Sequence, residues 1–247
     1  MERRMIGKLV GIARYPVKSM AGEELQHVRV EPYGVRGDRS HAFIEDGIEG
    51  WDRYLTAREV PNLLTYRAAY EIGGDSDETG FPRLRVTSPD GRRFEWDEQL
   101  LAEIRPQTKR SISLLRCQPD EESLMAVDAG GILIITDRTL RRLEQLLGRF
   151  VDRRRFRANL VVELEEGEIM EDAALIGCKL RIGDAVVEIT EACERCMMIT
   201  LDPDTLERNA RMLRIVNEEM GMLFGLYASV VQPGEVRAGD RIYLEKR

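Results

Sequence analysis

Cysteine, histidine and long apolar stretches are all scarce in this sequence, and each shortage excludes a class of protein. Four cysteines among 247 residues cannot build a disulfide-stapled fold, so we expect the thiols to be reduced. Apolar runs fall short of the roughly 20 residues that a membrane-spanning helix needs. The opening segment MERRMIGKLVG also lacks the apolar stretch of a signal peptide. A soluble, cytoplasmic protein without a membrane partner is therefore predicted.

Net positive charge is absent as well. The chain has 37 lysine and arginine residues against 44 aspartate and glutamate residues, which gives a net charge of -7 and a pI near 5.2. Because nucleic-acid-binding domains usually present a basic surface, we predict no nucleic-acid partner. One segment departs from this balance, since GRFVDRRRFRAN, residues 148–159, holds five arginines. Such a run is typical of a solvated helix end or loop, or of a local anion site.

The first third of the chain is dominated by short strand patterns. A hydrophobic fraction of 43% supplies a core for one large domain or two small ones. The segment LRVTSPDGRRFEW predicts a hairpin with Pro-Asp-Gly at its turn. No long helical pattern occurs before about residue 95, so a β-rich unit is expected there.

Strands and two helices alternate in the rest of the chain. The segment GILIITDRTLRRLEQLLG predicts a buried strand that leads into a helix, capped by Thr136 or Asp137 and ended by Gly148. A second helix is predicted in TLERNARMLRIVNEEMG, ending at Gly221, and strands in ANLVVEL, KLRIGDAVVEI, MMITL, LYASVV and EVRAGDRIYLE. We therefore predict an α+β, predominantly β protein. An N-terminal β-barrel-like domain over residues 1–102 would precede a mixed β-barrel domain with two main helices over residues 103–247.

Cys193 and Cys196 form a close pair in the segment ITEACERCMMITLDPDT, and local features leave four roles open for them. A structural zinc site needs further soft ligands, and the two histidines lie far away in the sequence. A redox dithiol needs a helix N-terminus at its first thiol, where none is predicted. The pair is also explained by packing in a core loop. The fourth role is one functional thiolate beside Arg195, whose charge Glu194 opposes.

The segment ACERCMMITLDPDT resembles the cysteine motif of the MOSC domain, the module named after the C-terminal part of molybdenum cofactor sulfurase. Earlier blocks, ARYPVKSMAG, YGVRGDRSHAFIE and LTAREVPNL, resemble the N-terminal β-barrel domain that precedes MOSC. VDAGGILIITDRTLRRLEQLLG, RFRANLVVE, EDAALIGCKLRIGD and PGEVRAGDRIYL follow in family order. This ordered set spans Ile6 to Leu244 and is far more specific than a lone CxxC pair. The chain is thus similar to the amidoxime-reducing and 6-N-hydroxylaminopurine-resistance proteins.

The resemblance implies a protein that binds the molybdenum cofactor, Mo-molybdopterin, and reduces N-hydroxylated compounds. By its place in the motif, Cys196 would be the catalytic protein ligand to molybdenum, with Cys193 packed beside it, and a soft thiolate suits this metal. Asp128 matches an acidic, catalytic position near the metal. Within the arginine-rich segment, Arg153 to Arg155 are assigned to solvent. The family blocks imply that cationic and polar side chains bind the cofactor and its phosphate, namely Lys18, Ser19, Arg39, Arg58, Arg157 and Asn159.

The resemblance also leaves alternatives and sets expectations for partners. A carrier that holds cofactor or sulfur on Cys196 without turnover, or a degenerate barrel that serves as an interaction module, would share these blocks. No ferredoxin-like cysteine cluster follows them, so we expect a small-molecule substrate and a separate electron-donor protein. Pyridoxal phosphate is associated with MOSC-containing sulfurases through a separate lysine-bearing domain, which is not expected here. Glu194 stands where close reductase relatives have serine and Leu206 where glycine is usual, so no particular substrate is predicted.

Overall fold

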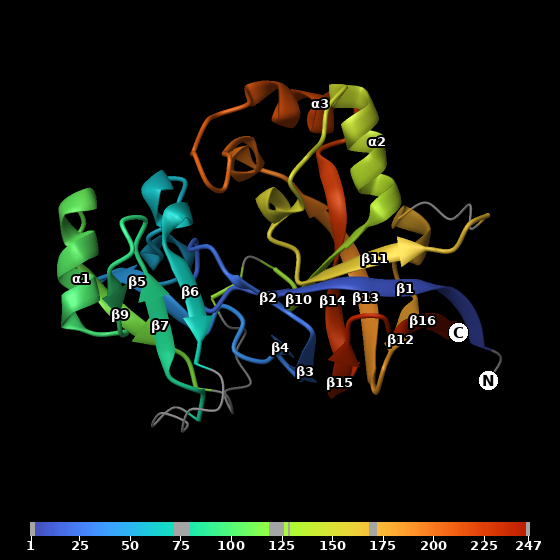
Figure 1. Cartoon of the computed structure of the whole chain (residues 1–247), viewed down its shortest axis with the longest axis horizontal. Helices are drawn as coiled ribbons and strands as arrows, with labels where there is room; N and C mark the ends of the chain where they lie inside the picture. The colour runs from blue at the N-terminus through green and yellow to red at the C-terminus, as the bar shows by residue number, and fades with distance from the viewer. Residues whose placement is uncertain (1–2, 72–79, 119–125, 128, 168–171, 246–247) are drawn as a thin grey trace.

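A closed ring of seven strands organises the second half of the chain (Figure 1). The computed structural model describes residues 3–71, 80–118, 126–127, 129–167 and 172–245. In ring order the strands are β11 (Leu160–Leu164), β10 (Ile132–Thr136), β14 (Leu223–Gln232), β13 (Ala185–Glu194), β12 (Lys179–Ile182), β16 (Arg241–Glu245) and β1 (Arg3–Arg14). Pairing of β1 with both β16 and β11 closes the barrel. Because β10 and β11 run parallel and the other neighbours antiparallel, the barrel is mixed, as predicted.

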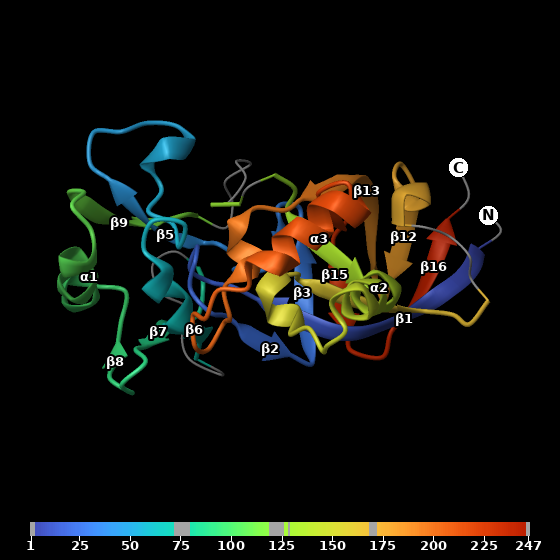
Figure 2. The same ribbon diagram turned by 90° about the horizontal axis from the view of Figure 1, so that it is seen from above.

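Two smaller sheets form an N-terminal unit beside the barrel (Figures 1 and 2). One consists of β5 (His41–Glu45) and β9 (Ile112–Arg116), the other of β6 (Arg67–Tyr70), β7 (Leu84–Thr87) and β8 (Arg93–Phe94). A third small sheet, of β15 (Gly234–Arg237), β3 (His27–Glu31) and β4 (Gly34–Val35), lies against the barrel and contributes valines to its core. β7 and β8 form the predicted hairpin. The connecting helices are η1 (Trp51–Arg53), η2 (Pro61–Thr65), α1 (Glu98–Ile104) and η3 (Arg105–Gln107).

The N-terminal segment of the chain also contributes to the barrel. β1 is a full member of the ring, and β2 (Glu23–Leu25) pairs with its C-terminal end at Ile12 to Arg14. Near the C-terminus, β15 pairs with β3, and both strands contribute valines to the barrel core. The barrel and its core therefore take strands from both ends of the sequence, while the division near residue 102 stays a prediction. The predicted class, α+β and predominantly β, is confirmed.

The two main helices, α2 (Asp137–Leu147) and α3 (Ala210–Met220), cover one side of the barrel (Figure 1). Thr136 caps α2 because its hydroxyl accepts a hydrogen bond from the backbone of Thr139, and Gly148 ends the helix in a left-handed conformation at φ 70°. Gly221 ends α3 in the same way. These boundaries were predicted from the sequence. Within the described ranges, no helix is long and apolar enough to span a membrane.

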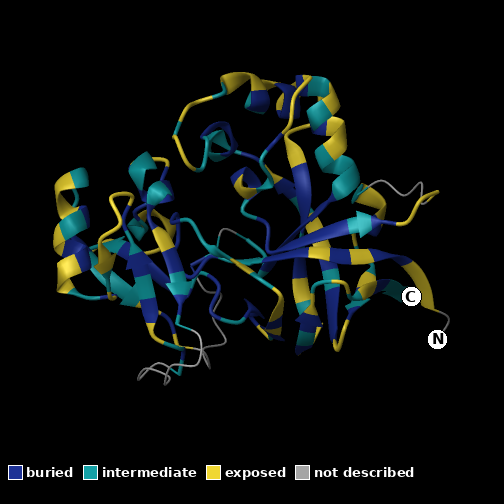
Figure 3. Cartoon of the chain, viewed as in Figure 1, coloured by how far each residue is buried: buried dark blue, intermediate teal, exposed yellow. Residues whose placement is uncertain are grey.

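Three apolar clusters hold these layers together (Figure 3). One fills the N-terminal unit around Phe43 and Phe81, the second fills the barrel around Leu9 and Ile189, and the third packs α2 and α3 against the outside of the barrel. Removing such side chains from water supplies most of the driving force for folding. Leu201, from the second half of the chain, is a buried member of the first cluster, so it helps to join the two units.

A close backbone contact joins β4 to the segment before β10 at two glycines. A Cβ atom on Gly131 would lie 2.1 Å from the carbonyl oxygen of Tyr33, and one on Gly34 would lie 2.2 Å from the carbonyl oxygen of Gly131. Gly34 also has a φ of 133°, which side chains rarely allow. Only glycine fits at both positions, and the contact fixes the start of β10 against β4.

Two predictions around the cysteine pair are wrong. The segment MMITL is not a strand, because the 3-10 helix η6 (Met197–Thr200) follows β13 directly. The predicted helix does not begin near Thr205 but at Ala210, after a turn in which Leu206 takes a left-handed φ of 61°. Two further 3-10 helices, η4 (Arg153–Phe156) and η5 (Asp172–Leu175), precede β11 and β12.

The strained conformation of Leu206 leads to a stability prediction. Its side chain packs against the N-terminal cluster, while its left-handed backbone costs about 1–2 kcal/mol for a residue with a Cβ atom. Leu206→Ala removes the packing and keeps the strain, whereas Leu206→Gly removes both. We expect the glycine variant to be more stable than the alanine variant by about 1 kcal/mol in urea unfolding. The usual order, with alanine the more stable, would show that the turn is not left-handed.

Candidate functional site

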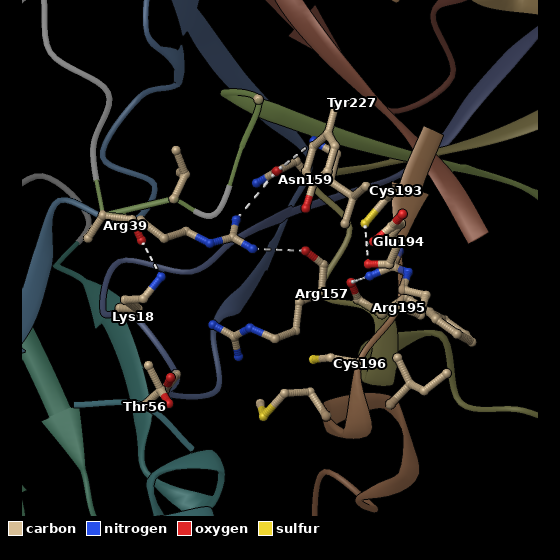
Figure 4. A pocket seen from close by; sticks show the side chains of 18 of the residues that line it. Lys18, Arg39, Thr56, Arg157, Asn159, Cys193, Glu194, Arg195, Cys196 and Tyr227 are labelled. Atoms are coloured by element: carbon tan, nitrogen blue, oxygen red, sulfur yellow. Dashed lines mark hydrogen bonds between the residues drawn. The ribbon is translucent and has the colours of Figure 1, made fainter. Parts of the chain in front are cut away.

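A pocket lies where the N-terminal unit meets the barrel, and it brings together residues from the whole length of the chain (Figure 4). Its wall includes the end of β13, the helices η1, η4 and η6, and the segment before β10. Every candidate residue that the structure describes lines this one pocket: Lys18, Ser19, Arg39, Arg58, Arg157, Asn159 and Cys196. The remaining candidate, Asp128, lies outside the described residues.

The two thiols of the cysteine pair have different surroundings. Cys196 is half-buried at the N-terminus of η6, where the extended backbone of β13 turns into the helix. Cys193 is only 2% exposed, packs in the cluster beneath α2 and α3, and approaches the carbonyl oxygen of Glu194 at 3.5 Å. Neither cysteine forms a disulfide, and both line the pocket (Figure 4). Cys196 is thus the more accessible thiol, and Cys193 packs behind it.

Lys18 and Ser19 occupy the rim that the N-terminal unit contributes. The ammonium of Lys18 donates to the carbonyl oxygen of Ala126 at 2.9 Å and lies 3.9 Å from the ring centre of Trp51, and the residue is only 6% exposed. Ser19 has a left-handed φ of 69°, and its hydroxyl accepts a hydrogen bond from the backbone of Ala57 at 3.0 Å. That bond holds the backbone of Ala57 in place. The next residue, Arg58, is an exposed cation on the pocket wall.

Arg39 and Arg157 both pack against the ring of Tyr15. Their guanidinium carbons lie 4.7 Å and 4.3 Å from the ring centre of Tyr15. Arg39 donates to the backbone carbonyl of Arg157 at 3.0 Å and pairs with Asp38, while Arg157 donates to the carbonyl of Met20 at 2.6 Å. Burial raises the pKa of the Tyr15 hydroxyl, and the charges of Arg157 and Arg39 oppose that rise. These contacts fix two cationic head groups at the pocket.

Asn159 acts mainly as a structural connector. Its side-chain oxygen accepts hydrogen bonds from the backbone of Leu133 at 3.1 Å and from Arg39 at 3.4 Å. Its side-chain nitrogen donates to the carbonyl of Ala13 at 3.3 Å. The residue is 1% exposed, so it links β1, β10 and Arg39 from inside the wall. It positions the cation beside it, and its binding role stays a prediction.

Arg155 was assigned to solvent, and this assignment is wrong. The residue is 7% exposed, because its guanidinium donates to the carbonyl of Thr200 at 3.2 Å and to the carboxylate of Asp202 at 2.6 Å. These bonds tie η4 to the segment that follows Cys196. Arg195 has a comparable role, since it donates to the carbonyls of Phe224 and Phe156 and is 8% exposed. Sequence reasoning missed Arg155 because it stands in a run of charged residues, where burial depends on distant partners.

The Arg155–Asp202 pair predicts a pH-dependent stability. Burial alone would raise the pKa of Asp202, but backbone hydrogen bonds from Thr205 and Asp204 and the charge of Arg155 outweigh it, so the pKa is lowered. A lowered folded-state pKa contributes stability above the unfolded value of about 3.9, and this stability is lost as the pH falls through the folded value. Burial also lowers the pKa of Arg155, so desolvation offsets part of the attraction.

We therefore expect Asp202→Asn to cost about 1–2 kcal/mol at pH 7 and less at pH 3, which is below the unfolded pKa of about 3.9, measured by urea unfolding at both values. Asp204→Asn is the matched control, because Asp204 is 65% exposed in its pair with Arg154 and should cost less than about 0.5 kcal/mol. An equal loss from Asp202→Asn at pH 7 and pH 3 would contradict the ionic contribution.

Positive charge dominates the described lining of the pocket. Among these residues, Glu194 is the one acidic side chain, against six basic side chains: Lys18, Arg39, Arg58, Arg155, Arg157 and Arg195. The chain as a whole carries a net charge of -7, so this excess is local. A concave wall of one sign concentrates ligands of the opposite sign. The pocket therefore suits an anionic ligand that also meets a thiol.

The fold and the site together define a class of protein: a mixed β-barrel with a cationic pocket that contains a thiol. The model of the MOSC N-terminal beta barrel domain matches residues 6–131, and the model of the MOSC domain matches residues 121–243. The chain therefore belongs to the MOSC family and carries both of its domains.

Named relatives and a solved structure resemble the chain over different lengths. Mitochondrial amidoxime-reducing component 1 of Mus musculus is 29% identical, with coverage of 98% of this chain and 83% of that protein. Mitochondrial amidoxime reducing component 2 of Macaca fascicularis is 25% identical, with 97% and 84% covered. Molybdenum cofactor sulfurase of Bombyx mori is 34% identical over 88 residues, 35% of this chain and 10% of that protein. The YuaD protein from Bacillus subtilis shares the fold at a TM-score of 0.52, with 13% identity and 100% and 98% covered.

Proposed function

We propose that this protein binds the molybdenum cofactor in the cationic pocket and reduces N-hydroxylated compounds there, with Cys196 as the protein ligand to molybdenum. The observation that carries the proposal is the position of one accessible thiol on a wall with six basic side chains. Similarity to amidoxime-reducing components over 97–98% of this chain supports the reaction class. Similarity to molybdenum cofactor sulfurases over a shorter segment supports the cofactor.

The donor set of the pocket fits this cofactor. A thiolate is a soft ligand, and Cys196 presents its sulfur from the rigid junction of β13 and η6. The cofactor ends in a phosphate, which needs cationic hydrogen-bond donors, and guanidinium groups bind phosphate through two parallel bonds. The guanidinium groups of Arg157 and Arg39 are held in place by packing against the ring of Tyr15. Because their orientation is fixed before binding, little conformational entropy is lost when the anion arrives.

Each part of the wall would have its own task in the reaction. The bound cofactor would supply two-electron removal of oxygen from the N–O bond, so that a hydroxylamine, two electrons and two protons give an amine and water. Cys196 would hold the metal, while Lys18, Arg39 and Arg157 would fix the phosphate end. The pair of Arg155 with Asp202 holds the segment after Cys196 in place. A separate electron-donor protein would supply the electrons.

Reduction of an amidoxime by a chemical electron donor tests the proposal directly. The protein is purified from a host that makes the cofactor, its molybdenum is measured, and turnover of benzamidoxime to benzamidine is followed with reduced methyl viologen. We expect turnover in proportion to molybdenum content. Cofactor-loaded protein without turnover would overturn the reductase and favour a carrier of cofactor or sulfur, the role that similarity to the sulfurases supports. Protein that retains no pterin would overturn both.

A further inference from the structure

A tryptophan with no catalytic task stands at the rim of the pocket. Trp51 begins η1 and lines the same wall as Lys18 and Cys196, yet 40% of the residue is exposed. The other tryptophan of the chain, Trp96, is 3% exposed within the N-terminal core. Because indole has a large apolar surface, an exposed indole beside a charged cavity gains stability from covering by a ligand.

The indole of Trp51 contacts a cation and a second aromatic ring. The ammonium of Lys18 lies 3.9 Å from its ring centre, and the Tyr54 ring lies 5.2 Å away at a tilt of 60°. Tyr54 in turn is fixed to β5 by its bridge with Ile44. A cation over the face of an indole contributes about 0.5–2 kcal/mol, so the ring is oriented before any ligand binds.

The segment that carries Trp51 stands away from the N-terminal unit (Figure 2). It contains two glycines in left-handed conformations, Gly47 at φ 77° and Gly50 at φ 69°, and a Cβ atom on either would meet nothing within 4 Å. Arg110 holds the base of the segment by donating to the carbonyl of Asp52 at 2.9 Å. Because 40% of Trp51 is exposed, part of its surface is open to a second planar group.

We infer that Trp51 is a specificity-determining residue, whose indole stacks against a planar aromatic group of the substrate while the N-hydroxylated group reaches the centre of the pocket. The preferred substrates are then aromatic or heteroaromatic N-hydroxylated compounds rather than aliphatic ones. This inference rests on the proposed reductase activity only for the identity of the reacting group, the N-hydroxylated nitrogen. Stacking on an aromatic side chain accepts any planar ring, so Trp51 selects a class of compound and not one molecule.

A comparison of two probes with the same reacting group tests the selectivity. KM is measured for benzamidoxime and for acetamidoxime in the wild type, Trp51→Leu and Trp51→Phe, each normalised to molybdenum content. We expect Trp51→Leu to raise the ratio of the benzamidoxime KM to the acetamidoxime KM about tenfold, and Trp51→Phe to restore most of the difference. The ratio cancels any effect through Lys18, which acts on both probes alike. An unchanged ratio would overturn the inference that Trp51 stacks on the substrate.

A binding measurement separates this inference from the reductase itself. Benzamide and acetamide, which cannot be reduced at an N–O bond, are titrated while tryptophan fluorescence is followed. We expect benzamide alone to change the emission, with Trp51→Leu as the blank and buried Trp96 as a constant background. Phe150→Leu is the matched control, because Phe150 is 80% exposed and is not among the residues that line the pocket.

The two measurements give distinct failures. A fluorescence response without turnover would overturn the proposed reductase activity and support stacking on Trp51. Turnover without a benzamide response would overturn stacking on Trp51 and support the reductase activity. Equal responses to benzamide in the wild type and in Trp51→Leu would place the planar ligand elsewhere and also overturn the inference.

Discussion

Replacement of Cys196 by alanine is expected to lower the molybdenum retained after purification by at least about tenfold. Loss of partners outside the first ligand shell already costs about 10- to 100-fold in metal affinity, and a direct ligand should cost no less. The thiol has no second cysteine that can replace it, because Cys193 is buried in the cluster under α2 and α3. Molybdenum is measured by mass spectrometry in protein from a host that makes the cofactor.

Cys193→Ala is the matched control for this experiment. It removes the neighbouring thiol of the same motif, and it should cost about 1 kcal/mol of stability through the small cavity it leaves. We expect this variant to keep most of its molybdenum. Equal molybdenum in Cys196→Ala and the wild type would contradict the assignment of the metal ligand, and selective loss in Cys193→Ala would transfer that role to Cys193.

Replacement of Arg157 by methionine is expected to weaken retention of the cofactor by about 10- to 100-fold. A hydrogen bond to a charged group contributes about 1.5–3 kcal/mol, and every 1.4 kcal/mol corresponds to tenfold in affinity. Arg157→Lys keeps the charge but loses the planar fork, so we expect an intermediate loss. Arg157 has a left-handed φ of 53°, and because methionine and lysine both carry a Cβ atom there, the head group is the main difference between the variants. The pterin released from each protein is quantified by fluorescence.

Arg154→Met is the control for charge. It removes one cation from the same arginine-rich segment, but Arg154 pairs with Asp152 and Asp204 outside the pocket. Its cofactor content should match that of the wild type. Urea unfolding of all three variants detects any general loss of stability, since Arg157 also donates to Met20 and packs on Tyr15. Equal cofactor content in Arg157→Met and Arg154→Met would remove Arg157 from the binding site.

Local patterns predicted much of the fold because their causes are local. The run from Ile132 to Gly148 contains an apolar strand, a capping threonine and a terminal glycine, so β10 and α2 follow from neighbouring residues alone. The segment after Cys196 has the same kind of residues as a strand, but it forms η6. Its side chains serve two cores, since Ile199 packs under the helices and Leu201 packs in the N-terminal unit. The strand propensity of these residues does not reflect the requirement to pack in two separate cores.

The sequence by itself determined most of the strands and helices and the family blocks that point to one pocket. The tertiary structure decided which thiol is accessible, which arginine of the 148–159 run is buried, and that Trp51 belongs to the rim. The reason is that burial and charge at the pocket come from contacts between distant segments. Arg157 bonds to Met20 across 137 positions and Lys18 to Ala126 across 108, distances at which the residue pattern of either segment carries no information about the other.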